Sequence, residues 1–124
     1  MVMRFAFRQA ILNLKNQLKH IIIKSFTTES GVQFNDIQLS YQLFGQELGA
    51  APIVLVNHAL TGNSDVAGEN GWWKDIIGTK KTIDTNNYTI LAFNIPGNGF
   101  DGFVIENYKS FIARDVANLF LIGL

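Results

Sequence analysis

The sequence has no cysteine, only two prolines and two histidines, and no net charge. These shortages exclude several classes of function. Without cysteine there is no disulfide, no thiolate metal ligand and no cysteine nucleophile, and His20 and His58 alone make a poor metal cluster. The ten basic and ten acidic side chains cancel, which argues against nucleic-acid binding. No apolar run approaches the roughly 20 residues that cross a bilayer. We therefore expect a soluble, cytoplasmic protein without a metal, in which serine or threonine would do any nucleophilic chemistry.

Charge is distributed unevenly along the 124 residues, which suit one globular domain. Residues 1–24 carry five basic and no acidic side chains, whereas residues 25–124 carry five basic and ten acidic ones, so the two parts have net charges of +5 and −5. Apolar residues recur every three or four positions between residues 3 and 20. This spacing predicts a basic amphipathic helix over residues 1–20, as an extension of a domain over residues 21–124. A membrane-surface anchor or a transit peptide is the functional alternative for this segment.

From residue 21 onward the pattern is typical of strands. β-branched residues over 21–28, a Ser-Gly turn and alternating apolar and polar residues over 37–43 predict an antiparallel hairpin. The uninterrupted apolar runs 53–56 and 88–93 are typical of parallel strands covered by helices on both faces.

Two helices are expected among these strands. A short one over residues 72–77 would end at Gly78, and a longer amphipathic one over residues 108–124 would turn Arg114 and Asp115 toward solvent. An opening hairpin followed by alternating strands and helices predicts an α/β three-layer sandwich.

Function is expected where the two parallel strands end, because the carboxyl ends of parallel strands meet at one edge of the sheet. Asn-His-Ala-Leu-Thr-Gly at 57–62 follows the first strand, and Asn-Ile-Pro-Gly-Asn-Gly at 94–99 follows the second. The first turn can aim a backbone N–H at a substrate oxygen, which is half of an oxyanion hole. Taken alone, His58 is as well explained by a hydrogen bond to the backbone, and the second loop by a glycine-rich connector.

Taken together, these motifs resemble the amino-terminal part of homoserine O-acetyltransferase, an α/β-hydrolase-fold enzyme of methionine biosynthesis. The resemblance covers residues 25–124 and implies an incomplete α/β-hydrolase-type sandwich. It rests on residues 57–62 and, further along, on Val66-Ala67-Gly68, Gly71-Trp72-Trp73, Ile76-Ile77-Gly78, Ile83-Asp84-Thr85 and Tyr88. The loop 95–99 departs from the family pattern and is closer to that of ordinary hydrolases.

The resemblance implies a ping-pong acyl transfer without a bound cofactor. A serine would take an acyl group from acyl-coenzyme A and pass it to the hydroxyl of homoserine, with a histidine as base and an aspartate orienting it. The backbone N–H of Leu60 would hold the oxyanion, and the candidates for substrate contact are His58, Thr61, Asn94 and Gly97. None of the five serines lies in a Gly-x-Ser-x-Gly elbow, and both histidines come too early for the family's order of residues.

We therefore interpret the chain as an amino-terminal fragment of such an acyltransferase, inactive by itself because it lacks the Ser-Asp-His triad. Two alternatives stay open: a fragment of an α/β-hydrolase esterase, and a non-catalytic subunit that pairs with a separately encoded carboxy-terminal half. Such a half or a second copy of the chain is the expected protein partner, because the edge of the strand at 53–56 would otherwise be unpaired. Trp72 and Trp73 are expected to pack in the core, with one of the two rings partly exposed.

Overall fold

The structure is a computed structural model that describes residue 4 and residues 17–124. The predicted amphipathic helix over residues 1–20 lies largely outside the described residues. Its last two positions, Lys19 and His20, belong to the first strand and pair with Tyr41 and Ser40. The β-structure thus begins two residues before the expected start at residue 21.

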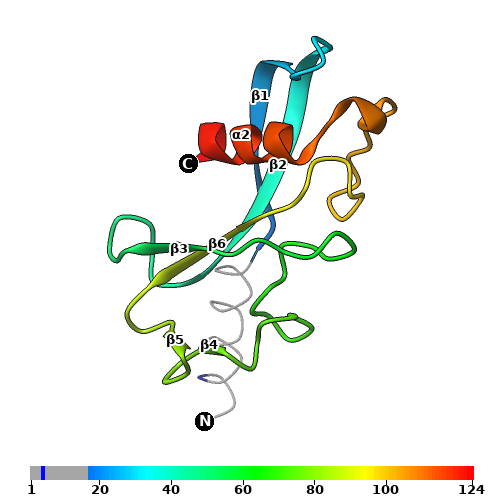
Figure 1. The fold of residues 1–124 in the computed structure, drawn as a ribbon. Helices are drawn as coiled ribbons and strands as arrows, with labels where there is room; N and C mark the ends of the chain where they lie inside the picture. The colour runs from blue at the N-terminus through cyan, green and yellow to red at the C-terminus, as the bar shows by residue number, and fades with distance from the viewer. Residues whose placement is uncertain (1–3, 5–16) are drawn as a thin grey trace.

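Four strands form a mixed sheet in the order β1-β2-β6-β3 (Figure 1). Strands β1 (Lys19–Thr27) and β2 (Gln33–Gly45) make the predicted antiparallel hairpin. Strand β6 (Thr89–Phe93) runs antiparallel to β2 and parallel to β3 (Ile53–Leu55), which confirms the predicted parallel pair.

The long strand β2 ends at Gly45 for a steric reason. The φ angle of this glycine is +80°, and a Cβ placed on it would lie only 2.5 Å from the carbonyl oxygen of Tyr88. Glycine alone reaches this conformation without a clash, so the chain can turn away here toward the loop before β3.

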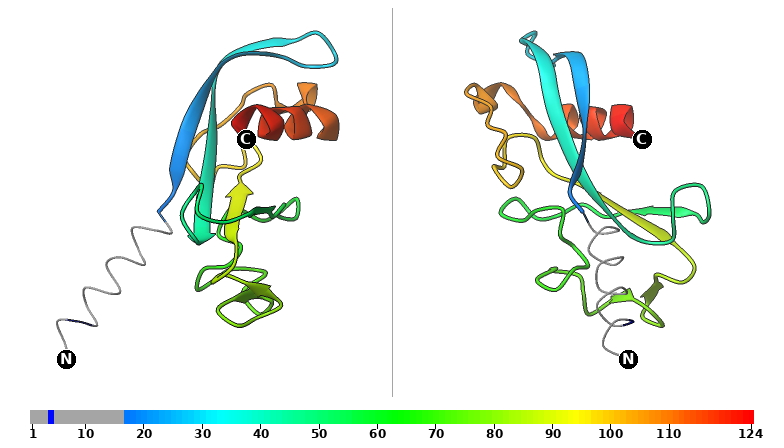
Figure 2. Two further views of the ribbon diagram at one scale, coloured as in Figure 1. Left: turned by 90° about the vertical axis from the view of Figure 1, so that its left-hand side faces the viewer. Right: turned by 180° about the vertical axis from the view of Figure 1, so that it is seen from behind.

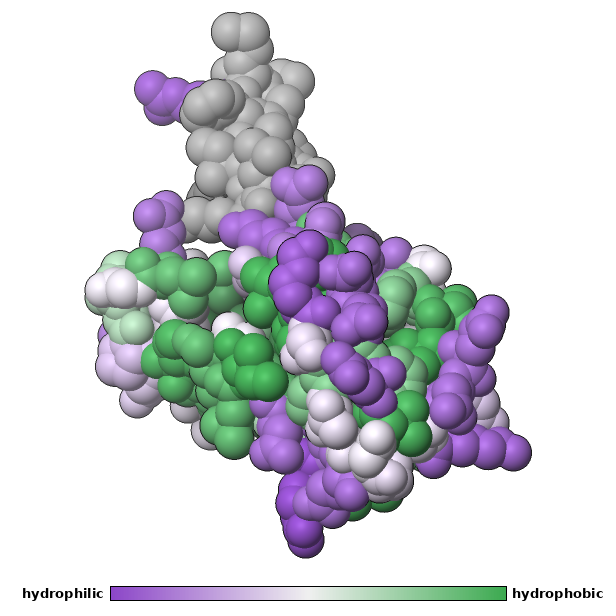
Figure 3. All heavy atoms as spheres, turned by 90° about the horizontal axis from the view of Figure 1, so that it is seen from above, coloured by the Kyte–Doolittle hydropathy of each residue, from purple (hydrophilic) through white to green (hydrophobic). Residues whose placement is uncertain are grey.

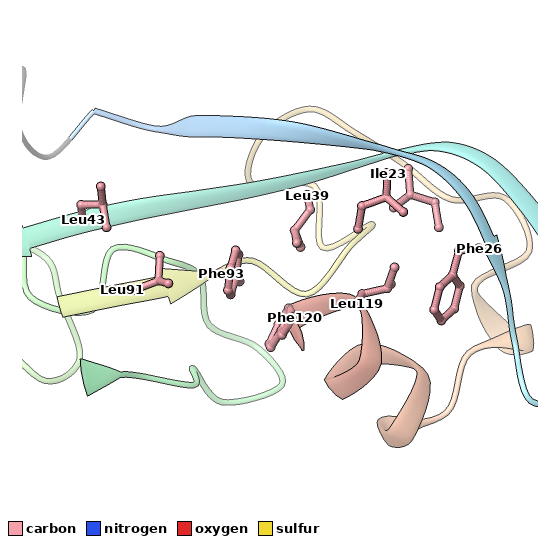
Figure 4. Close-up of a cluster of buried hydrophobic side chains, with 9 residues drawn as sticks. Ile23, Phe26, Leu39, Leu43, Leu91, Phe93, Leu119 and Phe120 are labelled. Carbon is pink, nitrogen blue, oxygen red and sulfur yellow. The ribbon is translucent and has the colours of Figure 1, made fainter. Parts of the chain in front are cut away.

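Each face of the sheet is covered by its own hydrophobic cluster. On one face, helix α2 (Ala113–Gly123) buries Leu119 and Phe120 against Phe93, whose ring lies 5.1 Å from that of Phe120 (Figure 4). Side chains alternate along a strand, so Ile90 and Ala92 of β6 face the other way. They pack in a second cluster with Phe44, Val56, Val66 and Ile77. The molecule therefore has three layers over β6, and loop segments between residues 56 and 88 supply the second outer layer.

The predicted helix over residues 72–77 is wrong. Residues 72–76 form turns, and Ile77–Gly78 is a short strand, β4, that pairs in parallel with β5 (Ile83–Asp84). The N–H of Trp73 donates to the carbonyl of Val66 at 2.8 Å, across the loop and not along a helix. Ile77 is buried in the second cluster, so its contact with the sheet prevails over the weak helical preference of a short segment.

The prediction that residues 53–56 are covered on both faces is also wrong. Strand β3 is the edge of the sheet, and the side chains of Ile53 and Leu55 are 47% and 36% exposed. Only Val56, just beyond the strand, is buried. The expectation of an unpaired edge at this strand holds within the described part of the chain.

The last predicted helix is divided in two. A 3-10 turn, η1 (Tyr108–Ser110), precedes α2, which lies across the β1-β2 hairpin and away from β4 and β5 (Figures 1 and 2). Asp115, expected in solvent, is 1% exposed. Its carboxylate accepts the N–H of Glu29 at 2.9 Å and that of Ile112 at 3.0 Å, so it caps α2 and joins the helix to the hairpin.

Candidate functional site

The loops that follow β3 and β6 lie against each other, as the strand order predicts. The backbone N–H of Ile95 donates to Nε2 of His58 at 3.1 Å, and the side-chain amide of Asn98 donates to the carbonyl of Gly62 at 3.4 Å. Two segments far apart in the sequence thus form one edge of the sheet, and each fixes the position of the other.

His58 serves this junction with both of its ring nitrogens. Because Nε2 accepts the Ile95 N–H, the ring proton lies on Nδ1, which donates to the carbonyl oxygen of Ala59 at 2.6 Å. Neither nitrogen is left for proton transfer to a nucleophile. A hydrogen bond between His58 and the backbone is one interpretation of the sequence, and the structure contains such bonds.

Leu60 lies at the tip of the first turn. A hydrogen bond of 2.8 Å from the N–H of Gly62 to the carbonyl of Ala59 closes this turn, and the Leu60 side chain is 86% exposed. Among the described residues, no group accepts a hydrogen bond from the Leu60 N–H. This donor is therefore open to an outside acceptor, as an oxyanion-hole donor must be.

A cavity of about 580 Å³ opens between the two loops and helix α2. Leu60 and His58 of the first loop and Gly97 of the second line one side of it. The opposite side is largely apolar and comes from η1, α2 and the segment between them, with Tyr108, Phe111, Val116 and Phe120. The cavity can enclose an apolar group beside one backbone donor.

Asn94 holds the floor of the site together and is 1% exposed. Its Oδ1 accepts the Ser64 N–H at 2.8 Å, and its Nδ2 donates to the hydroxyls of Ser40 and Ser64 at 2.8 and 2.9 Å. The Ser64 hydroxyl in turn donates to Gln42 Oε1 at 2.7 Å. With its side-chain atoms engaged inside the protein, Asn94 supports the loops and does not face the cavity.

Sequence reasoning missed this buried network. Ser40 and Gln42 alternate with apolar residues along β2, a pattern that normally turns polar side chains toward solvent, yet both are buried. The residue that could have indicated the network is Asn94, a polar residue that directly follows the five buried positions of β6. A buried amide needs hydrogen-bond partners, and here they are the Ser64 N–H and the hydroxyls of Ser40 and Ser64.

The two tryptophans do not pack in the core, which corrects the expectation. Trp72 is 84% exposed and Trp73 is 38% exposed. Trp72, Thr61 and His58 line a second, smaller cavity of about 270 Å³. Trp73 instead contributes its backbone N–H to the bond with Val66, so the pair is fixed by the main chain and not by burial of the rings.

The described residues do not assemble a triad. Ser64 is fully buried and bonded to Gln42, and His20 lies in β1 opposite Ser40. No group of three or more histidine, aspartate or glutamate side chains in the described part of the chain could hold a metal ion. No helix among residues 17–124 is long and apolar enough to cross a membrane.

Several known proteins are similar to this chain in sequence and in fold. Homoserine O-acetyltransferase of Corynebacterium diphtheriae is 40% identical over 87 residues, which are 70% of this chain and 23% of that protein. Its counterpart in Natronomonas pharaonis is 40% identical over 82 residues, or 58% of this chain and 20% of that protein. This chain is homologous to homoserine O-acetyltransferases. It spans about a fifth of the length of these curated relatives, and no family model matches it.

Solved structures agree with this relationship. Homoserine O-acetyltransferase from Staphylococcus aureus superposes with a TM-score of 0.70 at 30% identity, covering 86% of this chain and 34% of that one. Esterase E22 superposes equally well, with a TM-score of 0.70 at 25% identity over 87% of this chain and 36% of that one. The chain has part of an α/β-hydrolase fold, as the acetyltransferase motifs predict.

Proposed function

We propose that this chain supplies the oxyanion-binding part of an acyl-transfer site of the homoserine O-acetyltransferase type. A serine outside the described residues would attack the thioester carbonyl of acyl-coenzyme A, release the coenzyme A thiol and pass the acyl group to the hydroxyl of homoserine. The chain would contribute the Leu60 N–H to the developing oxyanion. In this view it works in the cytoplasm, in methionine biosynthesis.

The observation that carries the proposal is the unpaired N–H of Leu60 beside a largely apolar cavity. An oxyanion hole needs donors that are already oriented before the reaction, and the His58 to Ile95 bond keeps this turn in place. The 40% identity to a homoserine O-acetyltransferase over 87 residues of this chain supports the acyl-transfer chemistry.

The nucleophile, acid and base would have to come from another segment or another chain. Such a partner would add a strand at the outer edge of β3, which pairs with no other strand among the described residues and ends at the first loop. A parallel strand added there would end at the same sheet edge as β3 and β6, beside Leu60.

The test is to produce the chain together with the part of the Staphylococcus aureus homologue that this chain does not cover. We expect the mixture to release coenzyme A from acetyl-coenzyme A when homoserine is present, and the chain alone to release none above the blank. Leu60→Pro removes the N–H and should lower kcat in the mixture by about 10²- to 10³-fold, whereas the control Leu60→Ala keeps the N–H and most of the activity. Turnover by the chain alone, or equal activity of both variants, would contradict the proposal.

An esterase is the second candidate, because esterase E22 has the same fold over 87% of this chain and the loop 95–99 has the hydrolase pattern. The two candidates share an acyl-enzyme and differ only in the acceptor. Coenzyme A or p-nitrophenol release that does not depend on homoserine would favour the esterase. A stable complex without any turnover would favour a non-catalytic subunit.

A further inference from the structure

The second cavity, of about 270 Å³, has the properties of a separate binding site. It lies beside the first loop and is lined by His58, Thr61, Asn63, Asp65, Asn70 and Trp72 together with two small residues. Five of its eight lining residues have polar side chains, whereas most of the residues that line the larger cavity are apolar. Its size suits a small molecule, since drug-sized ligands need cavities of roughly 300–1,000 Å³.

Its electrostatic character is set by Asp65. The lining contains no lysine or arginine, and His58 is the neutral tautomer because Nε2 accepts the Ile95 N–H. Among the described residues, no group forms a hydrogen bond or ion pair with the Asp65 carboxylate. The cavity therefore carries one uncompensated negative charge, which favours a cationic ligand.

The carboxylate is also held in place. The backbone N–H of Asp65 donates to Oδ1 of Asn63 at 2.9 Å, which fixes the turn that presents the side chain. Oδ1 of Asp65 rests against the backbone of Gly68, where a Cβ would collide with it. Glycine at position 68 thus makes room for the Asp65 carboxylate.

Trp72 adds an aromatic wall to the same cavity. Its side chain is 84% exposed, which is unusual for the largest apolar side chain in a protein. An indole face attracts cations, and this attraction is strongest for ammonium ions that give up part of their hydration. The hydroxyl of Thr61 and the amide of Asn70 can accept hydrogen bonds from a ligand at the same place.

We propose that this cavity binds a small organic ammonium ion, with the Asp65 carboxylate as its counter-ion and the Trp72 indole as its aromatic wall. The inference does not depend on the acyl transfer proposed above, since it uses neither the Leu60 N–H nor the larger cavity.

The chain is suited to a direct binding experiment because it contains only two tryptophans. In a Trp73→Phe background, the emission of Trp72 reports on the cavity alone. Choline is titrated against its uncharged isostere 3,3-dimethylbutan-1-ol, with sodium chloride keeping the ionic strength constant. We expect a saturable change in emission with choline, and binding of the alcohol that is weaker by about tenfold or more.

Two matched variants locate the charge. Asp65→Asn in the same background should weaken choline binding by about tenfold or more, whereas Asp75→Asn, an exposed aspartate outside the cavity, should leave it within about twofold. An equal response to choline and the alcohol, or an equal effect of both variants, would overturn the proposal. The comparison of the two ligands on unsubstituted Asp65 decides the matter even if Asp65→Asn fails to fold.

Discussion

Nε2 of His58 accepts a hydrogen bond from the backbone N–H of Ile95, 3.1 Å away and 37 positions further along the chain. The bond joins the loop after β3 to the loop after β6, and it sets the place of Leu60, which lies two residues after His58. A residue that the sequence offers as a candidate for substrate contact thus acts on the site by holding its two loops together.

Replacing His58 with alanine should destabilise the protein by about 1–2 kcal/mol, because two hydrogen bonds are lost and the Ile95 N–H is left without its acceptor. The control is His20→Ala, since His20 lies on the edge strand β1 with an exposed side chain. Urea unfolding measures the free energies, and amide exchange at Ile95 should become faster in His58→Ala only. A similar loss in both variants would contradict the role of the bond.

Asn94→Ala should cost more, about 2–4 kcal/mol, because it leaves buried polar groups of Ser40 and Ser64 without partners. Asn107→Ala is the matched control, since the Asn107 side chain is exposed and does not cap η1. Thermal and urea unfolding of the two variants give the comparison. A loss below about 0.5 kcal/mol for Asn94→Ala would mean that water replaces the amide in the network.

The main outline of the fold could be predicted from the sequence because its signals are local. Alternation along β2 and the apolar run in β6 each indicate a strand, so the hairpin and the parallel pair followed from them, although the alternation gave the wrong burial for Ser40 and Gln42. The meeting of the two loops also followed, since it needs only the strand order.

The wrong predictions concern features that depend on contacts outside the segment in question. The burial of Asp115 depends on the backbone of Glu29, 86 residues away, and the turn at Trp73 depends on Val66. The exposure of Ile53 depends on whether a neighbouring strand is present at the edge of the sheet. The patterns of residues within 53–56, 72–77 and 108–124 cannot predict these features. Each feature depends on a contact with a residue or strand outside the segment itself.

Asp115→Asn should destabilise the protein by about 2 kcal/mol. The carboxylate accepts two backbone N–H groups, and an amide can accept with one oxygen only while it turns an NH₂ group toward the other donor. Asp75→Asn, at an exposed position, should stay within about 0.5 kcal/mol of the unsubstituted chain. Helix α2 should show faster amide exchange at its first turn in Asp115→Asn. Unchanged exchange there would show that the cap is not needed to hold the helix on the hairpin.

Asp84 gives the protein a defined dependence on pH. Backbone N–H groups of Asn86 and Lys80 donate to its carboxylate and hold the pKa of Asp84 below its usual range. A carboxyl whose folded pKa is lowered adds stability above the unfolded pKa, about 3.9, and this contribution is lost as the pH falls through the folded value. Asp84→Asn should therefore unfold at lower urea than the unsubstituted chain at pH 7, with the difference disappearing toward pH 2. A difference that does not change with pH would contradict the role of the charge.

The outer edge of β3, which is unpaired in the part of the chain that the structure describes, should make the isolated chain associate with itself. The side chain of Ile53 on this strand is 47% exposed, and hydrophobic residues form an extended area on the face of the molecule seen in Figure 3. Such an edge offers free backbone donors and acceptors to another strand, and a lysine placed on it opposes this pairing. We expect Ile53→Lys to reduce the oligomer size in light scattering and the binding of a hydrophobic dye, with little change in thermal stability because the side chain is half-exposed.

Val104→Lys adds the same charge at a position that is 69% exposed and outside every strand, so it should leave association nearly unchanged. If both lysines reduce association equally, net charge is the cause, and if the unsubstituted chain is a dye-silent monomer, the edge of β3 needs no partner.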